Sequence, residues 1–206
     1  MKRSIVSALL FACATQCYAL DVDEIISKTV TNYENMRTLY IEFSNVLCDE
    51  ASGTCIMTDG VIYFQKPNLF RLEMESPEQV YIGDSSTLWI YIPAENRAIK
   101  QSMTELPFQV NPDLFLRDYD ERFTATLIEE TEETYMIRLI PKDSTDVYDR
   151  INVDIAKDQY TIVGIAVFDD VGSENKYDFH EVEIDARISK KLLEFKPPSG
   201  VRVDEY

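Results

Sequence analysis

The sequence is poor in glycine and histidine, with six glycines and one histidine among its 206 residues. It contains neither a glycine-rich phosphate loop nor a dinucleotide-binding fingerprint. No Gly-x-Ser-x-Gly elbow marks a hydrolase nucleophile, and the single histidine, His180, lies in a segment with strand-like alternation. No loop alternates oxygen-bearing side chains around a fixed glycine, as a calcium site requires. We therefore expect no cofactor, no metal and no catalytic residue, and a binding protein rather than an enzyme.

Positive charge is also scarce, since 20 lysines and arginines face 37 aspartates and glutamates and leave a net charge of −17. Such a protein releases no counterions from nucleic acid and meets a repulsive field there, so we expect no nucleic-acid partner. An anionic membrane surface repels it in the same way. We interpret the acidic runs at residues 129–133 and 169–170 as solvated turns that keep the protein soluble.

Long hydrophobic runs are absent except near the N-terminus, where residues 5–14 follow a basic pair. This run is too short to span a bilayer as a helix, and Ala19 is a small residue of the kind that a signal peptidase recognises. We predict that residues 1–19 are a cleaved signal peptide and that residues 20–206 form one exported domain. Lipidation of Cys13 is the alternative reading of this terminus.

Cysteine is sparse as well, because removal of the signal peptide leaves only Cys48 and Cys55. The two lie between strand-like segments, with Gly53 at the tip of the intervening loop. In an oxidising compartment this spacing favours a disulfide that closes a hairpin loop. Two sulfurs without a histidine nearby make a poor zinc site.

The hydrophobic pattern predicts one helix followed by many strands. Apolar residues recur at three- and four-residue steps from Val22 to Tyr33, and Asp21 with Glu24 resembles a capping box. From Leu39 the period changes to two. Further strands are predicted, with short turns between them, at residues 56–66, 69–76, 78–83, 87–92, 97–102, 123–129, 135–140, 150–156, 161–168 and 176–184.

Two features shape this series of strands. Residues 60–74 contain two alternating runs that meet at Lys66-Pro67-Asn68, which predicts a turn because proline cannot donate to a ladder. The alternation stops at residues 103–119, a segment rich in large apolar side chains in which a short helix is predicted over residues 113–119. The pattern predicts a mainly β protein with helices: a strongly curved antiparallel sheet, or incomplete open barrel, whose concave side is covered by helices.

Aromatic residues are abundant: twelve tyrosines, ten phenylalanines and Trp89. A half-closed sheet lined by such residues would form a large apolar pocket. A well-packed core without a pocket is the alternative interpretation.

Three segments together resemble the family of periplasmic outer-membrane lipoprotein carriers, LolA. They are Gly-x-Ile-Tyr-Phe-x-Lys-Pro-Asn-Leu-Phe-Arg at residues 60–71, Thr-Leu-Trp-Ile-Tyr-x-Pro at residues 87–93, and Phe-x-Pro-Pro-x-Gly-Val-x-Val at residues 195–203. The resemblance implies an incomplete barrel with a helical lid, in the periplasm, whose apolar interior receives the acyl chains of a lipoprotein. It further implies a monomeric carrier that takes acylated lipoproteins from an inner-membrane ABC transporter and passes them to an outer-membrane receptor.

The resemblance also implies roles for individual residues. Lys66 matches a position, often arginine, that bonds lid carbonyls in the closed form, although lysine lacks the planar fork of arginine. Phe70 matches a position associated with productive handover, so Phe70→Glu is expected to spare folding and impair cargo acquisition. The Cys48–Cys55 loop is not a general feature of the family. The candidate lipid-binding residues are Phe64, Phe70, Trp89, Tyr91, Met103, Leu106, Phe108, Leu114 and Phe115.

The sequence is also compatible with three other functions. A receptor or envelope sensor of the same fold would bind lipidated protein as well. An exported lipid hydrolase would depend on His180. A secreted interaction module without a pocket would take up no apolar probe.

Overall fold

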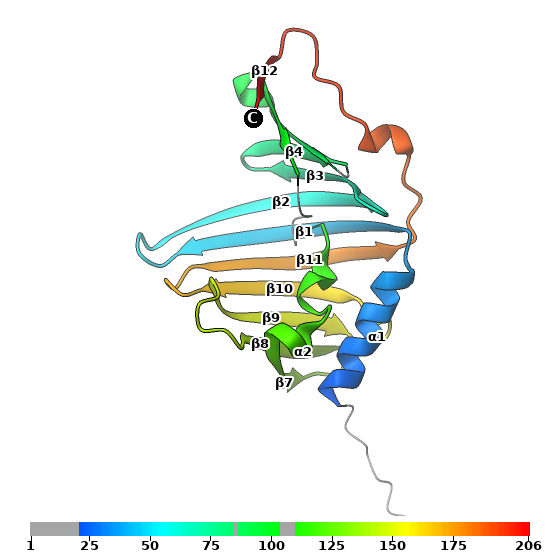
Figure 1. Ribbon diagram of the computed structural model, residues 1–206, viewed down its shortest axis with the longest axis vertical. Helices are drawn as coiled ribbons and strands as arrows, with labels where there is room; N and C mark the ends of the chain where they lie inside the picture. Colours follow the sequence, from blue (N-terminus) through cyan, green and yellow to red (C-terminus); the bar gives the residue numbers. More distant parts are fainter. Residues whose placement is uncertain (1–20, 85, 104–109) are drawn as a thin grey trace, which may run out of the picture.

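The computed structural model describes residues 21–84, 86–103 and 110–206 (Figure 1). Its first half contains α1 (Val22–Asn35), β1 (Thr38–Asp49), β2 (Thr54–Gln65), β3 (Leu69–Glu75), β4 (Glu78–Gly83), β5 (Thr87–Ile92), η1 (Pro93–Glu95) and β6 (Arg97–Ser102). The second half contains η2 (Pro112–Phe115), α2 (Tyr119–Arg122), β7 (Phe123–Glu130), β8 (Thr134–Pro141), β9 (Tyr148–Ala156), β10 (Ile162–Asp169), β11 (Glu174–Ile184), η3 (Lys190–Leu193) and β12 (Arg202–Glu205).

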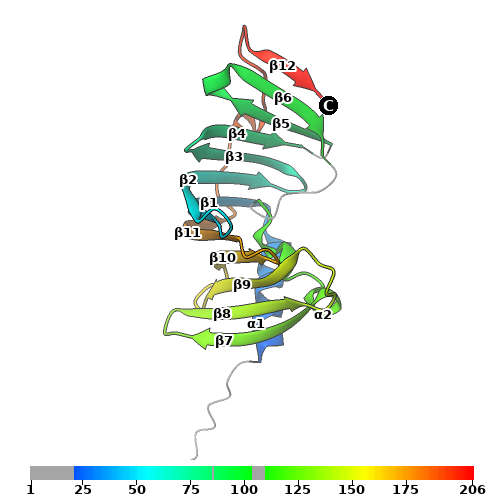
Figure 2. The ribbon, with the colours of Figure 1, turned by 90° about the vertical axis from the view of Figure 1, so that its left-hand side faces the viewer.

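The strands form one twelve-stranded sheet in the order β12-β6-β5-β4-β3-β2-β1-β11-β10-β9-β8-β7. Figures 1 and 2 show it as a strongly twisted sheet whose two edge strands, β7 and β12, lie at opposite ends, so the barrel stays open. Every neighbouring pair is antiparallel except β12 and β6, which are parallel. The predicted open antiparallel barrel is thus confirmed, with one parallel strand added at its edge.

Helix α1 is where the apolar periodicity predicts it. Its buried side chains are those of Ile25, Ile26, Thr29 and Tyr33, all on one stripe of the helix. The predicted capping box is wrong, because the Asp21 side chain makes no capping hydrogen bond within the described chain. The first turn is instead closed by the backbone, where the Asp21 carbonyl accepts the N–H of Glu24 at 3.0 Å.

The segment between β6 and β7 differs from the predicted helix over residues 113–119. The structure has the short η2 and the single turn α2, separated by residues 116–118, and the φ of Asp118, +48°, lies in the left-handed region. A left-handed residue interrupts the helical hydrogen bonds, so one continuous helix does not form.

The hydrophobic core lies on one face of the sheet, beneath α1 and the segment after β6. Figures 1 and 2 show α1 crossing β7 to β11 near one end of these strands. Buried residues of α1 join one cluster with Val110, Phe115 and Leu116 and with the strand side chains beneath them. We call α1 together with residues 110–122 the lid, and the face that the lid covers the inner face. The opposite side of the sheet is the outer face.

Candidate functional site

Strand register shows which side chains share the inner face, because residues directly opposite each other on neighbouring strands point to the same side. One row of such partners starts beneath the lid and runs across six strands. It consists of Ile41, Ile62, Leu72, Tyr81, Ile90 and Ile99. Every member of this row is apolar or aromatic, so the inner face is apolar far beyond the area that α1 reaches.

Burial decreases steadily along the inner face. Ile41 and Ile62 are fully buried, whereas Tyr81, Ile90 and Ile99 are only half-buried. In a second row, Phe64 and Phe70 are buried and Leu88 on β5 is half-buried, and the row ends at the polar Gln101 on β6. The apolar surface therefore continues out of the packed core onto strands β4, β5 and β6, where the described residues cover it incompletely.

Phe70 lies at the junction between the covered and the open part of the inner face. It is 0% exposed, opposite Phe64 on one side and Gly83 on the other. A Cβ atom at Gly83 would come within 2.1 Å of the Phe70 ring, so only glycine leaves room for that ring. This burial changes the expectation for Phe70→Glu, because the substitution places a carboxylate inside the core.

Several polar contacts hold the lid at the C-terminal end of α1. The Tyr33 hydroxyl accepts the backbone N–H of Ile162 at 3.0 Å, and burial raises the pKa of that hydroxyl. Lys66 Nζ donates to the carbonyl oxygens of Tyr33 at 2.8 Å and Glu34 at 2.6 Å. A cation at these carbonyls also interacts favourably with the negative end of the helix dipole. Burial, and then the charge of Arg117, lowers the pKa of Lys66.

A buried carboxylate lies beside this contact. Asp113 in η2 is 0% exposed; its Oδ2 accepts a hydrogen bond from Arg117 Nε at 2.5 Å, and its Oδ1 has no hydrogen-bond partner in the described structure. Burial raises the pKa of Asp113, against the opposing effects of Arg117 and Lys66. Ionising this buried, half-satisfied carboxyl group therefore costs free energy in the folded protein.

We predict that Asp113→Asn changes the free energy of unfolding at pH 7 by about 1 kcal/mol or less, because removal of the buried charge is offset by loss of the ion pair with Arg117 and by an amide N–H group without an acceptor. The raised pKa means that the folded state binds the proton of Asp113 more tightly than the unfolded state does. The free energy of unfolding of the native protein should therefore rise relative to that of the variant as the pH falls from 7 toward 4. Thermal unfolding of both proteins across this range checks the prediction, and a variant less stable by the same amount at every pH would contradict it.

The structure separates the predicted lipid-binding residues into two groups. Phe64 and Phe70 lie on the inner face. Trp89 and Tyr91 lie on the outer face, opposite Ile82 and Val80, and their rings contact Phe195 at centroid distances of 5.4 and 5.7 Å. The chain after β11 crosses the outer face there, so these two aromatic residues pack against the C-terminal segment.

Three of the remaining candidates, Met103, Leu114 and Phe115, lie in or near the lid. Phe115 is buried edge-on against Phe123 and Tyr148, at centroid distances of 6.5 and 5.6 Å. Met103 is half-buried against the core cluster, and Leu114 is half-buried in η2. Leu106 and Phe108 lie outside the described residues.

Sequence reasoning missed the half-buried residues of the inner face. These are Met74, Tyr81, Leu88, Ile90 and Ile99. Carrying the alternation from Ile62 through each tight turn, one strand at a time, would have assigned them to this face.

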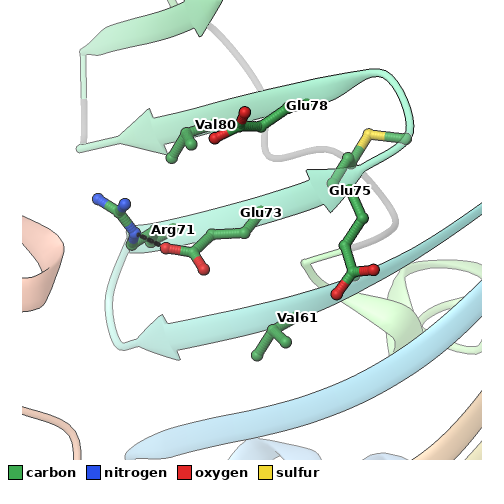
Figure 3. Close-up of a pocket in the computed structure, with 8 residues that line it drawn as sticks. Val61, Arg71, Glu73, Glu75, Glu78 and Val80 are labelled. Carbon is green, nitrogen blue, oxygen red and sulfur yellow. Dashed lines mark hydrogen bonds and ion pairs between the residues drawn. The ribbon is translucent and has the colours of Figure 1, made fainter. Parts of the chain in front are cut away.

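The outer face carries a pocket of about 370 Å³ over β2, β3 and β4 (Figure 3). Val61 and Val80 contribute its apolar part, and an ion pair between Arg71 and Glu73 crosses it. Glu75 and Glu78 add further negative charge at the rim. This mixed lining suits an acyl chain less well than the inner face does.

His180 lies on the outer face, with its Nε2 2.7 Å from Ser44 Oγ, and Ser44 Oγ donates to Asp59 Oδ1 at 2.6 Å. In a Ser-His-Asp triad the carboxylate accepts a hydrogen bond from the histidine, which holds the ring against the serine. Here the carboxylate contacts the serine instead, so the three residues do not form the hydrogen-bond chain of a triad.

Cys48 and Cys55 form a disulfide across the end of the β1–β2 hairpin, as predicted. Replacing both with serine should lower the free energy of unfolding by about 2 kcal/mol, because the bond closes a loop of only a few residues. Chemical denaturation of the two proteins measures the difference. Equal stabilities would contradict a stabilising role of the bond.

In the part of the chain that the structure describes, no three His, Cys, Asp or Glu side chains are grouped as metal ligands. No helix in the same part is both long and apolar enough to cross a membrane.

The chain is similar in sequence to known outer-membrane lipoprotein carrier proteins. The family model "Outer membrane lipoprotein carrier protein LolA" matches residues 34–196. An outer-membrane lipoprotein carrier protein of Coxiella burnetii is 26% identical over 175 residues, covering 82% of this chain and 81% of its own length. One of Erwinia tasmaniensis is 25% identical over 211 residues, covering 100% and 98%.

Solved structures show the same fold at low sequence identity. An uncharacterized conserved protein from Thermus thermophilus superposes with a TM-score of 0.59 at 11% identity, over 89% of this chain and 98% of the other. The lipoprotein LppX of Mycobacterium tuberculosis superposes with a TM-score of 0.52 at 6% identity, over 81% and 96%.

Proposed function

Because the chain belongs to the outer-membrane lipoprotein carrier family LolA, we propose that it is a periplasmic chaperone that shields the acyl chains of lipoproteins on its inner face. We further propose that it receives them from an inner-membrane ABC transporter and delivers them to an outer-membrane receptor. In this proposal residues 1–19 direct export, and residues 20–206 act as a monomeric, non-enzymatic carrier.

One observation carries this proposal: the apolar inner face extends from the fully buried Ile41 to the half-buried Ile90 and Ile99. A protein that needed only a core would gain nothing from leaving apolar side chains of its concave face half-covered. An acyl chain laid along this row would complete the cover.

The lid explains how such a carrier can release its cargo. Full burial of an acyl chain of about 16 carbons is worth roughly 12 kcal/mol, which would make release very slow. If cargo must displace α1 from part of the inner face, the contacts of α1 compete with the acyl chain and lower the net affinity. We propose that Lys66 determines how strongly α1 is held against the inner face, through its hydrogen bonds to the carbonyls of Tyr33 and Glu34.

Lys66→Met should therefore open the lid more readily, because it removes two charge-assisted hydrogen bonds while keeping an unbranched side chain. We expect uptake of a fluorescent fatty-acyl probe to become at least about tenfold faster, since about 1.4 kcal/mol corresponds to that factor. Lys66→Arg, which keeps the charge, is the matched control and should stay within a few-fold of the native rate. Unchanged uptake by Lys66→Met would remove Lys66 from the gating role.

The carrier function itself is tested by lipoprotein release. Purified residues 20–206 are added to Gram-negative spheroplasts, and newly made lipoprotein is followed. We expect it to leave the inner membrane in a soluble one-to-one complex, and His180→Ala to release as much. Failure of a folded protein that still takes up an apolar probe would favour a receptor or sensor of the same fold. If His180→Ala lost both lipoprotein release and a lipid-cleaving activity, the hydrolase would be favoured.

A further inference from the structure

The tip of the β1–β2 hairpin is built differently from the other turns of the sheet. In Figure 1 this hairpin reaches farther to the left than the neighbouring strands. The Cys48–Cys55 disulfide joins the two strands where their Cα atoms are 4.1 Å apart. The Asp49 side chain accepts the backbone N–H of Ser52 at 2.7 Å within the turn. The projecting tip is thus cross-linked and internally bonded.

This tip exposes large apolar side chains. Leu47 and Ile56 are cross-strand partners on the inner side of the hairpin, and Met57 is 70% exposed on its other side. Val171, 71% exposed, belongs to the β10–β11 turn, and that turn touches the tip where Gly172 lies against Glu50. We call Leu47, Ile56, Met57 and Val171 the tip patch. These side chains lie on both sides of the projecting hairpin, so they suit a partner that encloses the tip rather than one that lies against a single face.

The surroundings of the tip patch are strongly acidic. A pocket of about 460 Å³ beside it is lined by Phe168, Arg150 and several carboxylates, which are those of Glu50, Asp149, Asp169, Asp170 and Glu174. The one cation in this lining is already engaged, because Arg150 Nη1 lies 2.7 Å from Asp149 and its guanidinium lies 3.7 Å above the Phe168 ring. The potential at the tip is therefore negative and complements a cationic surface.

We propose that the tip patch docks a protein partner whose surface is an apolar groove rimmed by lysine and arginine. The acidic surroundings disfavour an anionic membrane surface as the occupant. The disulfide serves this docking, because a tip that is already ordered loses less conformational entropy on binding. The patch lies on the opposite end of the hairpin from the Lys66 contact, so the proposal goes beyond acyl-chain binding and does not depend on it.

The test uses three synthetic peptides of equal length: one alternating lysine and leucine, one alternating glutamate and leucine, and one alternating lysine and serine. Binding to the disulfide-intact protein is measured by fluorescence anisotropy. We expect only the lysine–leucine peptide to bind well, and Ile56→Ser/Met57→Ser and Glu50→Lys/Asp170→Lys each to weaken it at least tenfold. Val203→Ser, which removes an exposed apolar side chain from β12, is the control and should bind as the native protein does.

Thermal unfolding verifies that the tip variants are folded. Binding that the tip variants do not weaken would place the peptide elsewhere and overturn the proposal. Equal binding of the lysine–serine peptide would show that charge alone acts, which also overturns it. Flotation with phosphatidylglycerol or phosphatidylcholine vesicles that depends on Ile56 and Met57 would identify a membrane as the occupant instead. Cys48→Ser/Cys55→Ser should weaken the lysine–leucine peptide several-fold if the bond serves docking.

Discussion

Phe70→Glu is expected to unfold the protein or to leave it barely stable, rather than to spare folding. Phe70 is 0% exposed between Phe64 and Gly83, so the substitution places a carboxylate in the apolar core. Burying such a group without compensating bonds costs several kcal/mol, a large part of the roughly 5 to 15 kcal/mol that stabilises a domain. Circular dichroism during thermal unfolding measures the loss directly.

Two matched substitutions show whether position or chemistry causes this loss. Leu69→Glu introduces the same carboxylate at the neighbouring, half-buried residue of the outer face and should cost much less. Phe70→Leu keeps the site apolar and should cost about 1 to 2 kcal/mol. It is therefore the variant with which to examine a role of Phe70 in handover. A Phe70→Glu protein with native thermal stability would contradict the packing described for the inner face.

The second large effect concerns Ile90, on the half-buried part of the inner face. Ile90→Glu should leave the protein folded and weaken the binding of an acyl probe at least about 100-fold. The new carboxylate would lose its water beneath the acyl chain, and a cost of about 3 kcal/mol corresponds to that factor. Probe fluorescence titrated with native and variant protein gives the two affinities.

Tyr91→Glu is the control for this prediction, because the next residue of β5 points to the outer face. It should bind the probe nearly as well as the native protein, although its contact with Phe195 is lost. If Tyr91→Glu weakened binding and Ile90→Glu did not, the outer face would be the acyl site.

The elements of this fold follow closely from the sequence, and their faces do not. Hydrophobic period alone places α1 and strands β1 to β11, because helix and strand periods differ so clearly, whereas it does not predict β12. Strand β5 shows why the face on which a side chain lies is harder to predict. Leu88 and Ile90 alternate with Trp89 and Tyr91, so both sides of the strand are apolar and the period cannot say which side meets the lid.

The long-range contact that distinguishes the two sides of β5 comes from the other end of the chain. Phe195 packs on Trp89 and Tyr91, some hundred residues away in sequence, and β12 then pairs in parallel with β6. No local pattern in the strand indicates this cover. The burial of Asp113 has the same character, since a charged residue in a short helical turn normally suggests exposure.

The placement of the acyl chain on the inner face is tested most directly by photocrosslinking from two neighbouring residues. A photoreactive amino acid is introduced at Leu88, on the inner face, or at Trp89, on the outer face, and each protein is irradiated with a radiolabelled triacylated lipopeptide. We expect crosslinks from position 88 and few from position 89. Crosslinks mainly from position 89 would contradict this expectation and place the acyl chain beneath the C-terminal segment on the outer face.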